Sequence, residues 1–141
     1  MRVTIGEDAF EGCNGLVNLN LDHLDSINDG AFKDLLSLKE VTIKKLETVP
    51  KGLFNSCIKL EHLHLPDVKY VDSNAFENCA SLELVELPLA ETVYSNAFSG
   101  CDSLYYLLLE SAKGFEPEAY KSPNAPPLPK NLLVFLAPKF E

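Results

Sequence analysis

The sequence predicts one α/β repeat domain, a right-handed solenoid with a 22-residue period, and three observations predict it. A phenylalanine returns at every 22nd position, directly after an alanine or a leucine. A block of apolar residues, spaced by three and then by two, follows each phenylalanine. The pattern then decays into a proline-rich segment. A unit of this length cannot bury its apolar side alone, so stacked units must share one core.

The aromatic slot sets the register of the repeat. It is occupied by Phe10, Phe32, Phe54, Phe76 and Phe98, and Tyr120 continues the series. Polar residues that could cap a helix, such as Asp29, Ser73 and Ser95, stand shortly before the aromatic residue. We therefore expect a short helical or 3-10 turn in this segment, on the convex side of the solenoid.

The apolar block after each phenylalanine reads as a strand. Its members are Leu16-Leu19-Leu21, Leu38-Val41-Ile43, Leu60-Leu63-Leu65, Leu82-Val85-Leu87 and Leu104-Leu107-Leu109. Period-two alternation at its end predicts strands that pair in parallel on the concave face, with these side chains inward. Pro66 and Pro88 have no N–H to donate and should end two of the strands.

Four cysteines, Cys13, Cys57, Cys79 and Cys101, share the slot three positions after the phenylalanine. Neighbouring coils with helical turns on this side would lie about 8–10 Å apart. A disulfide needs Cα atoms within about 7 Å of each other. We therefore expect four buried, reduced thiols that act as small apolar side chains, and the alternative is a disulfide or a bound metal.

The unit from Val71 to Pro88 shows the full pattern, I-x-x-x-A-F-x-x-C-x-x-L-x-x-V-x-L-P. This pattern resembles the BspA-type leucine-rich repeats over roughly residues 3–112, although Leu35 stands in one cysteine slot. The resemblance implies a leucine-rich-repeat solenoid of a bacterial or protist surface protein that attaches to host or matrix proteins. It also implies a location at the cell surface or outside the cell.

The pattern changes at both ends of the chain. Phe115, Ala119 and Tyr120 keep their slots, but a proline-rich segment follows at 122–129. Residues 132–136 then form one more apolar run, which we expect to be a strand that covers the last edge of the sheet. We expect a single domain over 1–141, with five regular repeats at about 3–112 and a degenerate capping repeat over 113–141, forming part of a longer array. The N-terminal edge shows no cap, which leaves it open to missing repeats or to self-association.

Charge and composition exclude several classes of partner. The formal charge of −9 disfavours nucleic acid, because a phosphate backbone would be repelled. The chain has no apolar run of about 18 residues, so we expect no membrane insertion. The first residues lack the basic segment and apolar core of a secretory signal, so we expect no signal peptide in this chain.

Catalytic and metal chemistry have little support in the sequence. There is no glycine-rich phosphate loop and no nucleophile elbow, and we expect neither enzymatic activity nor a cofactor. His62 and His64 alternate with Leu63, which directs both imidazoles away from the core, and Glu40 and Glu86 stand at the same level on neighbouring strands. The alternative function is therefore a metal-binding protein or metal-dependent hydrolase that uses His62, His64 and Glu86.

The concave face carries the best functional signal. Its outward positions change from polar residues in the first units to an apolar and aromatic group in the last ones. This group contains Leu84, Tyr105, Tyr106 and Leu108, and Glu86, His62 and His64 stand beside it as further candidate partner-binding residues. Exposed patches that contain tyrosine are typical of protein-binding surfaces. We therefore expect a protein-interaction or adhesion-type binding module whose partner is a host, matrix or cellular protein. The alternatives are that the proline-rich tail covers the patch, or that the chain is a structural stalk segment.

Overall fold

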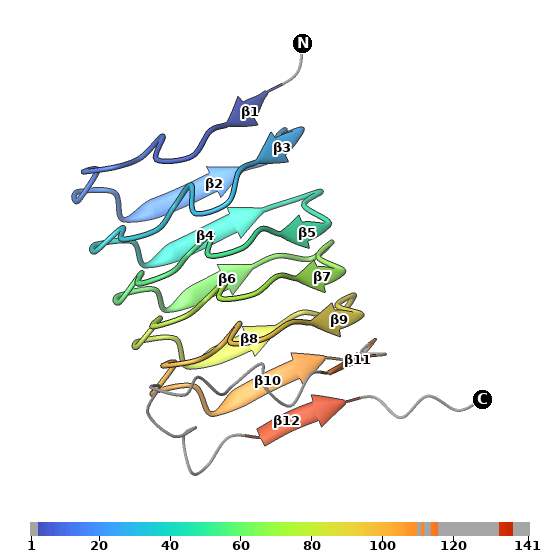
Figure 1. Cartoon of the computed structure of the whole chain (residues 1–141). Helices are drawn as coiled ribbons and strands as arrows, with labels where there is room; N and C mark the ends of the chain where they lie inside the picture. The colour runs from blue at the N-terminus through green and yellow to red at the C-terminus, as the bar shows by residue number, and fades with distance from the viewer. Residues whose placement is uncertain (1–2, 110, 112–113, 116–132, 137–141) are drawn as a thin grey trace.

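A computed structural model describes residues 3–109, 111, 114–115 and 133–136, and they form a stack of coils with two layers of parallel strands (Figure 1). The long-strand layer contains β2 (Asn18–Leu21), β4 (Glu40–Ile43), β6 (His62–His64), β8 (Leu84–Glu86), β10 (Tyr106–Leu109) and β12 (Leu133–Leu136). The short-strand layer contains β1 (Thr4–Ile5), β3 (Ser26–Ile27), β5 (Thr48–Val49), β7 (Tyr70–Val71), β9 (Thr92–Val93) and β11 (Gly114–Phe115). Tyr120 and the proline-rich segment at 122–129 lie outside the described residues.

The strand register follows the sequence period. Asn18 pairs with Glu40, Glu40 pairs with His62, and Leu84 pairs with Tyr106, each 22 residues apart. Strand β12 joins the other side of β10, with Tyr106 opposite Leu133. The expected effect of the prolines is confirmed, because β6 and β8 end two residues before Pro66 and Pro88 and have three residues, whereas β2, β4 and β10 have four.

The core is one apolar cluster that runs through the stack, as the repeat predicts. Phe32, Phe54, Phe76 and Phe98 are fully buried, and their rings form a continuous column with neighbouring centroids 5.3–5.6 Å apart. Phe10 extends the column at 5.0 Å, but its ring is tilted and only partly buried. These separations lie within the range of about 4.5–7 Å that aromatic pairs prefer.

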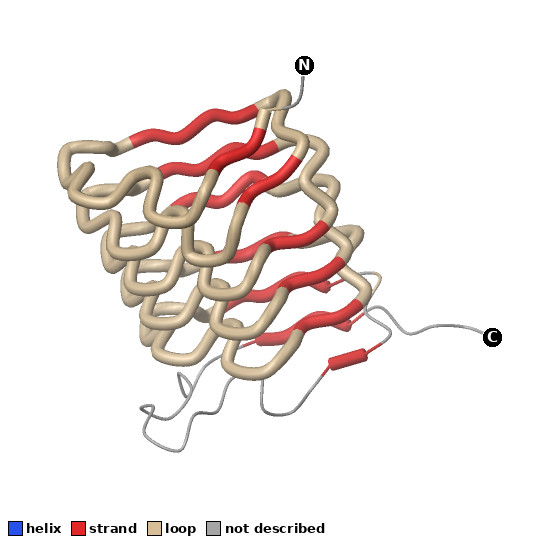
Figure 2. The backbone as a smooth tube through the Cα atoms, turned by 45° about the horizontal axis from the view of Figure 1, so that its top comes forward, coloured by secondary structure: helices blue, strands red, loops and turns tan. Residues whose placement is uncertain are grey.

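The helical or 3-10 turn expected beside the phenylalanines is not present. The described residues form no helix, and turns occupy this segment in each coil (Figure 2). Backbone conformation explains the difference, because two slots in each coil have positive φ and so interrupt a right-handed helix. These slots are occupied by Asp8, Gly30, Gly52, Asn74 and Asn96, and by Gly12, Asp34, Ser56, Asn78 and Gly100.

The turns bring neighbouring coils closer together than helices would. Phe54 N donates to Ala75 O at 2.8 Å, and Ser56 N donates to Glu77 O at 2.8 Å. The same bonds recur one coil later, from Phe76 to Ala97 and from Asn78 to Ser99. The expected spacing of 8–10 Å on this side is therefore wrong, since the coils are joined there by backbone hydrogen bonds.

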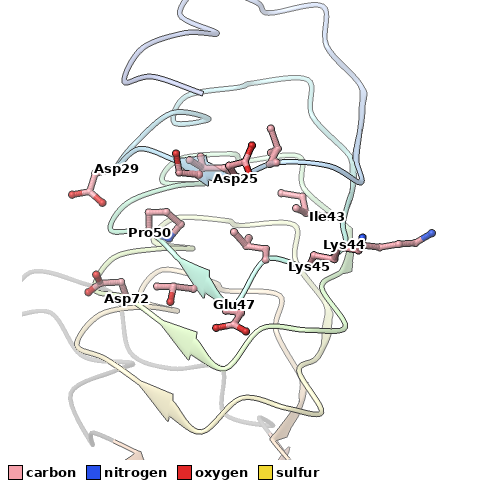
Figure 3. A pocket seen from close by; sticks show the side chains of 13 residues that line it. Asp25, Asp29, Ile43, Lys44, Lys45, Glu47, Pro50 and Asp72 are labelled. Atoms are coloured by element: carbon pink, nitrogen blue, oxygen red, sulfur yellow. The ribbon is translucent and has the colours of Figure 1, made fainter. Parts of the chain in front are cut away.

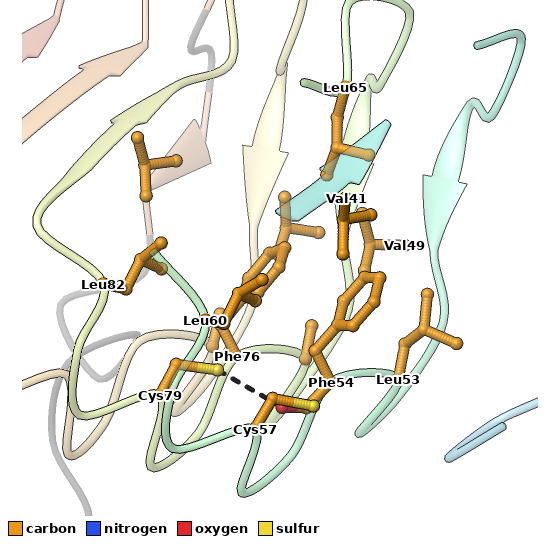
Figure 4. Packing of buried hydrophobic residues seen from close by; sticks show 14 of the residues in the cluster. Val41, Val49, Leu53, Phe54, Cys57, Leu60, Leu65, Phe76, Cys79 and Leu82 are labelled. Carbon is orange, nitrogen blue, oxygen red and sulfur yellow. Dashed lines mark hydrogen bonds between the residues drawn. The ribbon is translucent and has the colours of Figure 1, made fainter. Parts of the chain in front are cut away.

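The cysteines are free, and three of the four are buried. Cys57, Cys79 and Cys101 each donate an S–H to the phenylalanine carbonyl oxygen of the preceding coil at 3.1–3.2 Å, and one such bond is drawn in Figure 4. The expectation of four buried thiols is wrong for Cys13, which is exposed. Cys13 lies in the first coil, where the described residues include no earlier coil that could cover it.

Each layer of strands is interrupted once within the described residues. In the short-strand layer β3 and β5 are not paired. Asp72 N and Tyr94 N donate to the preceding coil at this level, but the equivalent residue is Pro50, which has no N–H. In the long-strand layer β6 and β8 lie side by side but do not form a ladder.

Candidate functional site

The outer face of the long-strand layer carries the predicted binding residues. His62, His64, Leu84, Glu86 and Tyr105 are exposed there. Tyr106 and Leu108 are half-buried. Tyr105 is therefore the more accessible of the two neighbouring tyrosines, with 48% of its surface exposed.

A groove of about 470 Å³ opens where β6 and β8 are unpaired. Its lining comes from three successive coils: Glu61, His62, Leu63, Ser81, Glu83, Leu84, Ser103 and Tyr105. The structure thus brings together His62, Leu84 and Tyr105 from the predicted set. It places His64, Glu86, Tyr106 and Leu108 outside this lining.

The sequence analysis did not select Glu61, Ser81, Glu83 and Ser103 of this groove, and the two glutamates are its acidic residues. They occupy the slot directly before the strand, which in successive coils holds Val17, Lys39, Glu61, Glu83 and Tyr105. A signal was available in this slot, because two successive acidic residues next to a tyrosine stand out from the apolar and basic residues of the first coils. Alternation along the strand did not include the slot, since it lies just outside the strand.

Some backbone groups at the groove also lack the cross-coil hydrogen bonds that the equivalent groups of other coils make. Glu61 N and His62 N both donate to Lys39 O, at 2.9 and 3.0 Å. Tyr105 N and Tyr106 N donate to Glu83 O in the same way, at 3.0 and 3.4 Å. Within the described chain, Glu83 N and Leu84 N make no such bonds to Glu61 O. The groove therefore offers two backbone donors and one backbone acceptor beside its side chains.

A second groove, of about 550 Å³, lies at the other interruption, next to Pro50 (Figure 3). Its lining includes Asp25, Asp29, Lys44, Lys45, Glu47 and Asp72. Four acidic and two basic side chains line it, and Glu47 is already paired with Lys69 at 3.2 Å. This groove presents no exposed aromatic side chain.

Comparison with known proteins identifies the repeat. The family model for BspA-type leucine-rich repeat regions matches residues 2–121, in six copies. The chain belongs to the BspA-type leucine-rich-repeat family. The resemblance seen in the sequence is thereby confirmed.

Two solved structures share the fold of this leucine-rich-repeat chain. A leucine-rich repeat protein from T. pallidum is 21% identical, with a TM-score of 0.70, over 82% of this chain and 57% of that one. A leucine-rich cell surface protein from Faecalibacterium prausnitzii is 23% identical, with a TM-score of 0.66, over 86% of this chain and 30% of that one. The chain thus spans about half of the first protein and less than a third of the second. The comparison with curated proteins found no match.

The metal alternative is not supported by the leucine-rich-repeat structure. Among the described residues, no group of three or more histidine, cysteine, aspartate or glutamate side chains is placed to hold a metal ion. His62 lies beside Glu61, with Nε2 and Oε2 4.0 Å apart, and His62 and Glu86 belong to strands that are not paired. The proposed set of His62, His64 and Glu86 is therefore not placed to bind one metal ion.

The described segments also contain no helix that could cross a bilayer.

Proposed function

We propose that this leucine-rich-repeat chain is a protein-binding module whose partner contacts the long-strand layer around the groove between β6 and β8. The observation that carries the proposal is the exposure of Leu84 and Tyr105, 40% and 48%, in the lining of one groove. Solenoid packing does not need these side chains, because the core is filled by the inward residues. An aromatic anchor with an aliphatic neighbour in a groove is typical of a protein-binding hot spot.

The remaining predicted residues extend this surface. Tyr106 and Leu108 follow on β10, and Glu86, His62 and His64 supply a polar border. A contact surface with an apolar centre and a polar rim excludes water from its centre, where most of the binding energy arises. We expect these outer residues to contribute less to affinity than Leu84 and Tyr105.

More specifically, we propose an adhesion-type role at the cell surface. It is supported by the family resemblance and by the name of the Faecalibacterium prausnitzii relative, which describes that protein as a cell surface protein. The partner would then be a host, matrix or cellular protein.

A panel of immobilised matrix and cell-surface proteins tests the proposal, with binding measured by interferometry. The test variant is the double substitution Leu84→Ser with Tyr105→Ser. The control is Leu36→Ser with Ile58→Ser, because both control residues are 43% exposed and lie outside the groove. We expect at least one panel protein to bind the parent chain and to lose about tenfold or more in affinity with the test variant only. Equal losses with both variants, or no binding by the parent chain, would overturn the proposal.

A further inference from the structure

The side chains and backbone of the groove point to the chemistry of its ligand. We propose that the groove between β6 and β8 binds an arginine side chain of the protein partner, an inference that rests on the proposed function. The guanidinium would lie between the carboxylates of Glu61 and Glu83, with its plane against the ring of Tyr105.

The acceptors in the groove match a guanidinium. Glu61 and Glu83 occupy the same slot of successive coils and line one groove, and neither carboxylate belongs to an ion pair with a lysine or an arginine within the described chain. The unpaired carbonyl oxygen of Glu61 adds a third acceptor. A guanidinium has five N–H donors in a fixed planar fork and pairs with carboxylates in two parallel hydrogen bonds. One arginine can therefore satisfy several acceptors of this groove at once.

The apolar part of the lining favours arginine over lysine. Tyr105 and Leu84 expose 48% and 40% of their surfaces. A guanidinium stacks on an aromatic face and is less strongly hydrated than an ammonium, so it loses less on entering a partly apolar groove. The methylene groups of the arginine stem would cover Leu84.

The unpaired backbone donors fit the main chain of the same partner segment. Glu83 N and Leu84 N make no cross-coil hydrogen bond, so they can donate to a carbonyl oxygen beside the bound arginine. The charge of the whole chain acts in the same direction, since a net −9 attracts a basic partner over a distance of about one Debye length. Local and long-range electrostatics are thus complementary to a cationic segment.

Three short synthetic peptides test the inference, with a central arginine, lysine or citrulline in an otherwise identical neutral sequence. Citrulline keeps the planar shape and removes the charge. Binding is followed by NMR on the isotope-labelled full chain, through the amide signals of Glu83, Leu84 and Tyr105. We expect the arginine peptide to shift these signals and to bind about tenfold more tightly than either of the other two peptides.

Charge-neutral variants locate the site. Glu61→Gln with Glu83→Gln should weaken binding of the arginine peptide by about tenfold. The control is Glu11→Gln with Asp29→Asn, which removes the same charge at exposed positions outside the groove and should change the affinity by less than about twofold. Equal binding of the citrulline or lysine peptide, or equal losses in the two variants, would overturn the inference.

The same variants separate this inference from the function on which it rests. If Leu84→Ser with Tyr105→Ser abolishes binding to a panel protein but Glu61→Gln with Glu83→Gln does not, the groove binds a partner without arginine, and only the inference fails. If neither pair of substitutions weakens that binding, the proposed function fails as well.

Discussion

The rings of Phe54 and Phe76 are stacked in the core, with centroids 5.5 Å apart and planes within 8° of parallel. Phe54 has a second stacked neighbour, Phe32, at 5.6 Å, so it lies in the middle of the aromatic column. Its removal leaves a cavity that the coils on either side cannot close, because backbone hydrogen bonds fix their separation.

We predict that Phe54→Ala lowers the free energy of unfolding by about 3–5 kcal/mol, measured by chemical denaturation. The matched control is Tyr94→Ala, at an aromatic residue that is 39% exposed, and its effect should stay within about 0.5 kcal/mol. Similar losses for the two variants would mean that the aromatic column does not stabilise the solenoid.

One of the four cysteines should react readily with a thiol reagent in the native chain, and the other three should not. Burial raises the pKa of Cys57 and Cys101 to about 12 and raises the pKa of Cys79 well above its ordinary value. Since the thiolate is the reactive form, these three should react slowly in the native chain, whereas the exposed Cys13 should react fast. Mass spectrometry after a short treatment with a thiol reagent should find one label. Two or more labels in the absence of denaturant would contradict the burial of the slot.

The same pKa shifts predict a loss of stability at alkaline pH. The thiol pKa values in the folded chain lie above the ordinary value of 9.0, so the stabilisation from the neutral thiols is complete below about pH 9 and is lost as the pH rises towards 12. In this window the unfolding constant should rise by up to about tenfold per pH unit for each buried thiol. Tyrosine and lysine also titrate there, so the measurement compares the parent chain with Cys57→Ala. An unchanged slope in the variant would show that Cys57 does not contribute.

Positive φ in the turns predicts a graded response to alanine. Gly52 has φ of +62° and no close neighbour, so Gly52→Ala should cost about 1 kcal/mol through backbone strain alone. At Gly100, with φ of +73°, an added Cβ would also meet the side-chain oxygen and the Cα of Asn78, and Gly100→Ala should cost about 2 kcal/mol or more. The control is Gly15→Ala, at an open position, which should be nearly neutral. Thermal unfolding of the three variants should follow this order, and an equal effect of all three would refute the assigned turn conformations.

The fold was largely predictable because the same positions of each 22-residue repeat are buried in successive coils. Phe32, Phe54, Phe76 and Phe98 return every 22 residues, and each faces the same environment in its own coil, so one pattern specified register, core and strand direction. The predicted helical turn was wrong because the glycine and asparagine residues of this segment adopt positive φ, which outweighs the capping potential of its aspartate and serine residues. Gly52 and Asn74 occupy one such slot in successive coils, and residues of this kind at a 22-residue spacing are a sequence signal against a helix there.

The candidate site was only partly predictable, for a different physical reason. Leu84 follows from alternation along its strand, and Tyr105 follows as an aromatic residue at the edge of the apolar patch, because neither side chain has a place in the core. The groove between β6 and β8 depends on the separation of two coils, and no single residue at 61–64 or 83–86 encodes an unpaired ladder in the way that Pro50 does in the other layer. Glu61 and Glu83 stand out in the sequence as two acidic residues in one slot, but their place in a groove follows only from the three-dimensional structure.

Amide exchange in the free chain provides a test of the unpaired ladder. Glu61 N and His62 N donate to Lys39 O, whereas Glu83 N and Leu84 N make no equivalent bond within the described chain. The amides of Glu83 and Leu84 should therefore exchange with solvent about tenfold or more faster than those of Glu61 and His62. Equal protection at the two pairs would mean that β6 and β8 form a regular ladder in solution.

Amide exchange in the presence of a bound panel protein shows where the partner lies on the solenoid without any substitution. We expect new protection at Glu83 and Leu84 and at neighbouring amides of the groove, with no change around Asp29 and Glu47 in the second groove. Protection confined to the second groove, or to the turns on the phenylalanine side, would contradict the assignment of the binding surface to the groove between β6 and β8.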